Sequence, residues 1–212
     1  MPRPGEADPF RLQARAEGFV SRAVYKLKGI DQKYRLFRPG FRVLDLGCSP
    51  GSWLQYIGGK VGPTGLAVGV DLTPPEISVV HPLYFVPGDV ESLDFRAVTA
   101  ISPYFDVVVS DMAPKTTGVR QVDQQRSLEL AQKALACAQK LLKPGGHLLV
   151  KVFEGPEVAV LVARMNQAFE GCHRVKPPGS RQASPEIYLL GLNKLARPGQ
   201  EKRPRTPRTR RP

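Results

Sequence analysis

Three acidic residues follow short apolar runs, at points where buried strands would end. Asp45 lies in LDLGCSPGSW, Asp71 in GVDL and Asp89 in PGDV. In an open parallel sheet, ligands bind beyond the carboxyl ends of the strands, so these carboxylates are expected to share one pocket. Their negative charge would repel a pyrophosphate and attract a ligand that carries an amino group or a sulfonium. The set therefore favours S-adenosylmethionine over NAD as the cofactor.

The glycines after the first of these runs point the same way. A dinucleotide site favours the pattern G-x-G-x-x-G, whereas here Gly47 and Gly51 are four residues apart with Pro50 between them. Glycine lets the backbone approach a ligand closely. Asp71 is placed to accept hydrogen bonds from a ribose diol, and Asp89 from the exocyclic amine of a purine. An NAD-dependent oxidoreductase remains the alternative from a different class, but no Tyr-x-x-x-Lys pair supports it.

A lysine and an acid on neighbouring runs could perform a reaction. Lys151 lies inside the apolar run LLVKVF, where an amine is costly unless it is paired. Asp111 follows FDVVVS, in SDMAP, and would leave the adjacent strand at the same edge. The alternative is a lysine whose stem reaches out of a strand end. The nearby acid favours a paired, working lysine.

Two further residues could complete this group. Lys26 lies in SRAVYKL, which predicts a helix capped by Ser21. Glu186 begins the apolar run EIYLLGL. It would reach the same edge if that last strand runs antiparallel to the others. Taken singly, each of these two charges is more often an ordinary surface residue.

The elements that must position these residues alternate along the chain. Nearly continuous Val- and Leu-rich runs are typical of strands covered on both faces. Apolar residues at three- and four-residue steps predict helices between them, and Lys-Pro-Gly-Gly at 143–146 is expected to stop the longest one. The pattern predicts an α/β fold with a parallel sheet between helices. The predicted strands are 42–46, 66–70, 83–86, 105–110, 147–153 and 186–192, with a short segment at 172–176, and the clearest helices are 122–142 and 157–169.

Length and charge suggest one domain with basic extensions. The chain has 212 residues, 42% of them hydrophobic, and a net charge of +12. We expect a basic helical extension at 1–37, a catalytic domain at 38–193 and a disordered basic tail at 194–212. A strongly basic chain favours nucleic acid as its partner. No apolar run is long enough to span a membrane and no signal peptide is evident, so a cytoplasmic protein is expected. The three cysteines match no metal-ligand spacing, and no metal is expected.

Six separated motifs carry a family resemblance. SRAVYKL, DLGCSPGSW, GVDL, SDMAP, VKVF and SPEIYLL occur in the order seen in the FtsJ/RrmJ-type ribosomal RNA methyltransferases. The chain resembles this family over roughly residues 8–193. The resemblance implies a Rossmann-like, S-adenosylmethionine-dependent methyltransferase fold, with a mostly parallel seven-stranded sheet and an antiparallel last strand. It also implies methylation of the ribose 2′-oxygen of a uridine in 23S, or large-subunit, ribosomal RNA.

The resemblance also implies roles for particular residues. The family's catalytic tetrad falls on Lys26, Asp111, Lys151 and Glu186. Its cofactor contacts fall on Gly51, Trp53, Asp71, Asp89 and Asp111. Ser52 stands where the family often has a second glycine, and we expect only a local adjustment of the loop there.

The implied partner is ribosomal RNA, within the large ribosomal subunit. Arg11, Arg15, Arg22, Lys28 and the basic tail could contact its phosphates. Tyr25 could stack on a base or pack in the core. A family member that acts on transfer RNA is the nearest alternative. No extra apolar helix suggests a dimer, so a monomer is expected.

Overall fold

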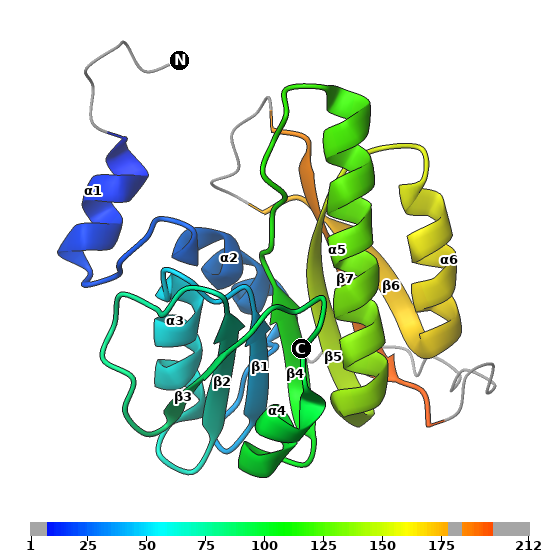
Figure 1. Ribbon diagram of the computed structural model, residues 1–212. Coiled ribbons are helices and arrows are strands. Elements are labelled where there is room, and N and C mark those ends of the chain that lie inside the picture. Colours follow the sequence, from blue (N-terminus) through cyan, green and yellow to red (C-terminus); the bar gives the residue numbers. More distant parts are fainter. Residues whose placement is uncertain (1–7, 178–183, 197–212) are drawn as a thin grey trace, which may run out of the picture.

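The computed structural model describes residues 8–177 and 184–196, and these build one seven-stranded sheet in the order β3-β2-β1-β4-β5-β7-β6 (Figure 1). Strands β1 to β5 pair in parallel, whereas β7 is antiparallel to both of its neighbours. The predicted α/β sheet with an antiparallel last strand is confirmed. The strands are β1 Arg42–Leu46, β2 Leu66–Asp71, β3 Leu83–Pro87, β4 Phe105–Ser110, β5 Leu142–Phe153, β6 Phe169–Val175 and β7 Glu186–Lys194.

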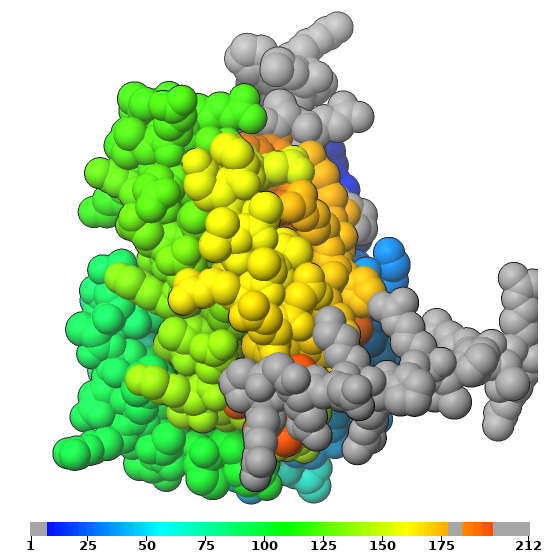
Figure 2. Space-filling model, turned by 90° about the vertical axis from the view of Figure 1, so that its right-hand side faces the viewer, coloured from blue at the N-terminus to red at the C-terminus, as the bar shows by residue number. Residues whose placement is uncertain are grey.

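Helices cover both faces of the sheet and create two apolar cores. Helices α4, α5 and α6 bury one face, where β-strand residues such as Leu46, Val108 and Val150 are shielded from water. Figure 2 shows α5 and α6 side by side over this face. Helices α2 and α3 bury the other face through residues such as Leu27 and Ile57. The helices are α1 Pro9–Ala16, α2 Val24–Tyr34, α3 Ser52–Val61, α4 Phe95–Ile101, α5 Arg120–Leu141 and α6 Val158–Ala168.

Several boundaries differ from the sequence-based predictions. The 143–146 turn does end α5, but it then forms the irregular first part of β5 instead of a free loop. The β4–β5 register shifts between Phe105 and Val107, so the extra β5 residues are accommodated there. The segment predicted at 172–176 is the longer strand β6. Helix α4 was not predicted, because it is only seven residues long.

The topology brings the functional ends of the strands to one edge. The chain order reverses between β1 and β4, which separates the loops that follow these two strands and opens a crevice at their carboxyl ends. Because β7 is antiparallel, its first residue lies at this same edge, opposite the last residue of β5. No helix within the described ranges combines the length and apolarity needed to cross a membrane. Most of the predicted basic tail lies outside those ranges.

Candidate active site

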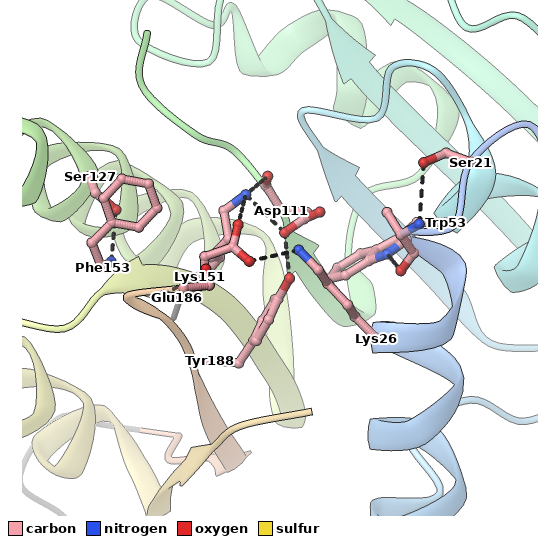
Figure 3. A network of polar contacts seen from close by, with 11 residues as sticks. Ser21, Lys26, Trp53, Asp111, Ser127, Lys151, Phe153, Glu186 and Tyr188 are labelled. Carbon is pink, nitrogen blue, oxygen red and sulfur yellow. Dashed lines mark hydrogen bonds and ion pairs between the residues drawn. The ribbon is translucent and has the colours of Figure 1, made fainter. Parts of the chain in front are cut away.

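The four residues of the expected tetrad converge at the carboxyl edge of the sheet (Figure 3). Lys151 Nζ lies 3.0 Å from Asp111 Oδ1 and 3.8 Å from Glu186 Oε1. It also donates a hydrogen bond of 2.5 Å to the Asp111 backbone carbonyl. Lys26 Nζ lies 2.9 Å from the second oxygen of the Glu186 carboxylate. Two amines and two carboxylates, distant in sequence, therefore form one continuous ionic network.

Strand register explains why two of these side chains, those of Lys151 and Glu186, meet. In β5 and β7, Lys151 pairs with Tyr188 and Phe153 pairs with Glu186. Alternate residues of a strand share a face, so Lys151, Glu186 and Tyr188 all project toward the face that α2 covers. Lys151 is only 5% exposed. An amine so deeply buried is stable because both carboxylates and a carbonyl surround it.

Tyr188 belongs to this network, although the sequence analysis gave it no role. Its hydroxyl donates a 2.5 Å hydrogen bond to Asp111 Oδ1, and its side chain is fully buried. Burial and the neighbouring Asp111 carboxylate raise the pKa of Tyr188 well above its usual value, so the hydroxyl stays protonated and donates. Tyr188 lies two residues after Glu186 on a predicted strand and therefore on the same face. This spacing was the signal that could have identified it.

Helix α2 carries Lys26, and α3 holds the start of α2 in place. The indole Nε1 of Trp53 donates a 2.9 Å hydrogen bond to the backbone carbonyl of Ala23. The helix begins at Val24 and not directly after Ser21 as expected. The side-chain oxygen of Ser21 instead accepts a hydrogen bond from the backbone amide of Ala23, just before the helix begins. Lys26 thus leaves the first turn of α2 at a position that Trp53 determines.

A cavity of about 410 Å³ adjoins the network. Among its lining residues are Asp71, Asp89 and Asp111, three of the five residues expected to contact the cofactor. Gly51 and Trp53 do not line it. Its wall is completed by Gly47, Ser49, Leu72, Gly88, Val90, Met112, Ala113 and Leu130.

Hydrogen bonds from backbone amides to the carboxylates shape the loops around this cavity. Asp71 accepts bonds from the backbone amides of Ser49 and Thr73, which ties the loop after β1 to the end of β2. Asp89 accepts a bond from the amide of Glu91. Among the described residues, no group of three or more His, Cys, Asp or Glu could hold a metal ion.

Comparison with known proteins identifies the family. The family model described as FtsJ-like methyltransferase matches residues 19–194. The chain belongs to the FtsJ-like methyltransferase family. The match includes all four residues of the expected tetrad and Tyr188.

Similar proteins agree with this membership. Ribosomal RNA large subunit methyltransferase E of Bdellovibrio bacteriovorus is 42% identical over 190 residues, which cover 88% of this chain and 96% of that protein. The protein of the same name from Syntrophobacter fumaroxidans is 43% identical, over 87% of this chain and 94% of its own length.

Solved structures support the fold. A crystal structure described as a candidate ribosomal RNA methyltransferase of Plasmodium falciparum has a TM-score of 0.72 and 28% identity, over 84% of this chain and 100% of that one. Fibrillarin of Aeropyrum pernix, solved with bound S-adenosylmethionine, has a TM-score of 0.56 and 17% identity, over 80% of this chain and 73% of its own. This FtsJ-like methyltransferase therefore has the Rossmann-like methyltransferase fold that the motifs implied.

Asp45 gives the methyltransferase an unpartnered carboxyl group below the cavity loops. The side chain is 1% exposed, and neither of its oxygens has a hydrogen-bond partner among the described residues. Burial raises the pKa of Asp45 well above its usual value, and the charges of Asp111 and Asp71 add to the effect. The raised pKa favours the neutral carboxylic acid at Asp45, so the negative potential at this edge comes from the neighbouring Asp71 and Asp111.

Gly47 allows Met112 to pack against the loop after β1, and we expect Gly47→Ala to weaken both folding and cofactor binding. Gly47 has φ of +78°, and a Cβ there would lie 2.5 Å from Met112 Cγ. Gly145 has φ of +80° with open space around it, so Gly145→Ala isolates the backbone strain of about 1–2 kcal/mol. Displacing Met112 should cost Gly47→Ala about 1–3 kcal/mol more. Urea unfolding and cofactor titration measure both effects; equal losses in the two variants would contradict the steric argument.

Glu186 should make the stability of the FtsJ-like methyltransferase pH-dependent. Burial would raise the pKa of Glu186, but the hydrogen bond from Lys26 and the charges of Lys26 and Lys151 outweigh it and lower this pKa below its usual value. The ionised form is thus favoured by folding. Its contribution is complete above the ordinary pKa of about 4.3 and is lost as the pH falls through the lower folded pKa.

The comparison of wild type with Glu186→Gln tests this pH dependence. The wild type should have the larger free energy of unfolding at neutral pH, and the difference should shrink as the pH falls below about 4.3. Urea denaturation at a series of pH values measures it. A difference that is the same at every pH would show that the charge of Glu186 contributes nothing.

Proposed function

We propose that this protein transfers a methyl group from S-adenosylmethionine to the 2′-oxygen of a uridine ribose in large-subunit ribosomal RNA. The observation that carries the proposal is the double role of Asp111. Asp111 lines the cavity at the strand ends, and its carboxylate pairs with the buried amine of Lys151. A cofactor in that cavity would therefore lie next to the ionic network.

The donor set of the cavity fits S-adenosylmethionine. Carboxylates of Asp71, Asp89 and Asp111 suit an amino group, a ribose diol and an exocyclic amine, while Leu72 and Met112 offer apolar surface to an adenine ring. The charges of Asp71 and Asp111 beside the buried Asp45 favour a cation over a pyrophosphate. When bound, S-adenosylmethionine supplies a methyl group on a positively charged sulfur. We include Gly51 and Trp53 among the contacts on the strength of the family pattern.

The side chains of the network would align the ribose and remove its proton. We assign Lys151 the role of base, because the Asp111 and Glu186 carboxylates hold its Nζ in a fixed position beside the cavity. It acts from the neutral amine, after its ammonium proton has passed to solvent. The 2′-hydroxyl would give its proton to the neutral amine as the oxygen attacks. Lys26 and Glu186, joined at 2.9 Å, would hold the sugar. Because S-adenosylmethionine carries a good leaving group, alignment and general-base catalysis are the main contributions that the protein needs to make.

The RNA assignment draws on the relatives and on charge. Two relatives over 40% identical carry the name ribosomal RNA large subunit methyltransferase E. The net charge of +12 suits a polyanion. We propose the assembled large subunit as the partner and a monomer as the working form. We also propose the expected cytoplasmic location, which agrees with a ribosomal substrate.

Methyl transfer from labelled S-adenosylmethionine tests the proposal. Purified large ribosomal subunits and bulk transfer RNA serve as parallel substrates, and digested nucleosides are separated to locate the label. We expect 2′-O-methyluridine from the large subunit. Label in transfer RNA alone would favour the alternative substrate, and label on a base would overturn the assignment to ribose.

A further inference from the structure

A second hollow, of about 360 Å³, lies between α1 and the start of α2. Its lining includes three arginines, Arg11, Arg15 and Arg22, together with Gly18 and Val20. Figure 1 shows α1 beside the start of α2, beyond the carboxyl edge of the sheet. The hollow thus lies on the same side of the molecule as the ionic network.

Of the three arginines that line this hollow, two have no counter-ion among the described residues. Arg22 forms an ion pair with Asp8, and Lys28 pairs with Glu17 at 2.5 Å. The Lys28 hydrogen bond in particular lowers the pKa of Glu17 below its usual value, so this carboxylate remains charged and occupied. Arg22 and Lys28, both expected to contact phosphates, are therefore neutralised within the protein.

Arg11 and Arg15 have no ion pair with any described residue, and both are exposed. They are four residues apart on α1, where like charges face each other and destabilise a helix. An anion between them would remove that repulsion. Guanidinium groups bind phosphate oxygens in a two-pronged geometry, so a phosphodiester is the anion that suits this pair.

The hollow is held rigidly relative to the network. The side-chain amide of Gln55 donates to the Gly18 carbonyl and accepts from the Val20 amide, at 3.1 Å in each case. Trp53, two residues earlier on α3, binds Ala23 at the start of α2. The segment between α1 and Lys26 is therefore attached to the helix that begins at the cavity loop.

We infer that this hollow binds the sugar–phosphate backbone of the substrate RNA beside the methylated nucleotide, with Arg11 and Arg15 as the phosphate contacts. The inference rests on the proposed RNA substrate and specifies where that substrate is held. A strand that crosses the hollow continues along the start of α2 toward Lys26. Binding there contributes to RNA affinity and leaves the chemical step unchanged.

The double variant Arg11→Ala/Arg15→Ala tests the inference. Both residues are exposed on α1, and alanine has a high helix propensity, so this helix should persist in the double variant. Affinity for protein-free large-subunit RNA is measured by filter binding at several salt concentrations. Two lost phosphate contacts should reduce the slope of log K against log salt by about 1.4 for single-stranded and about 1.8 for duplex RNA. The KM for RNA should rise with kcat unchanged.

Two further variants sharpen the result. Arg96→Ala/Arg164→Ala removes the same charge from exposed positions on α4 and α6 and should leave the slope near that of wild type. Arg11→Lys/Arg15→Lys keeps the charge and should restore most of the slope. If the alanine double variant and the α4–α6 control have equal slopes, the hollow is not an RNA site.

Failure of the inference can be told apart from failure of the proposed function. A wild type that methylates RNA ribose, with an unchanged slope and KM in Arg11→Ala/Arg15→Ala, overturns the inference alone. A wild type whose RNA affinity depends on Arg11 and Arg15, but which places no methyl group on ribose, overturns the proposed function alone. A wild type that does not bind RNA overturns both.

Discussion

Lys151→Met should lower the rate of methyl transfer by about 10²- to 10⁴-fold, the usual contribution of a positioned general base. Methionine keeps the length and apolar character of the stem and removes the amine that lies 3.0 Å from Asp111 Oδ1. The cavity is lined by Asp111 but not by Lys151, so affinity for the cofactor should be retained. Single-turnover methyl transfer and cofactor titration measure the two quantities separately.

Lys140→Met is the matched control for this experiment. Lys140 is exposed near the end of α5, where its amine lies 4.6 Å from the ring centroid of Phe95 and away from the network. Its variant should retain full activity. A rate for Lys151→Met equal to that of the control would exclude Lys151 as the base. A parallel loss of cofactor binding would instead make it a structural residue.

Asp111→Ala should destabilise the fold by about 3–5 kcal/mol, because it leaves a buried charge without its main counter-ion. The Lys151 side chain is 4% exposed and cannot return to water, whereas the Asp111 side chain is 19% exposed. Glu186 remains at 3.8 Å but is already bound to Lys26. Tyr188 also loses the acceptor of its hydroxyl. Removing the acid should therefore cost more than removing the amine.

A double variant separates the charge effect from the loss of packing. In Asp111→Ala/Lys151→Met no buried ammonium remains, so the free energy of unfolding should recover much of what Asp111→Ala lost. Its rate of methyl transfer should stay as low as that of Lys151→Met. Urea unfolding of both single variants and the double variant gives the coupling energy. Additive losses would mean that the two groups do not interact. Asp111→Asn, which keeps an acceptor for Tyr188, should be less destabilised than Asp111→Ala.

Part of the lining of the 410 Å³ cavity could be predicted because its signals are local. The apolar runs and the acids that end them lie within a few residues of one another, and parallel strands put their carboxyl ends together. Asp71 and Asp89 were placed at the cavity by this rule alone, whereas Asp45, which the same rule assigned to the pocket, is buried and does not line it. Trp53 shows its limit, since its side chain points to Ala23 and not into the cavity lining. The loop's sequence contains no information about which side chain meets another helix.

The sequence by itself determined the alternating strands and helices, the acidic strand ends and the order of the family motifs, because local burial patterns and turn residues encode them. Tertiary structure alone decided which charges meet. Tyr188 reaches Asp111 across 77 residues and Lys26 reaches Glu186 across 160, through the register of an antiparallel strand and the docking of α2 on the sheet. It also decided that Arg22 and Lys28 are neutralised while Arg11 and Arg15 are not. Contacts at such separations depend on how whole elements pack, and no window of sequence contains that packing.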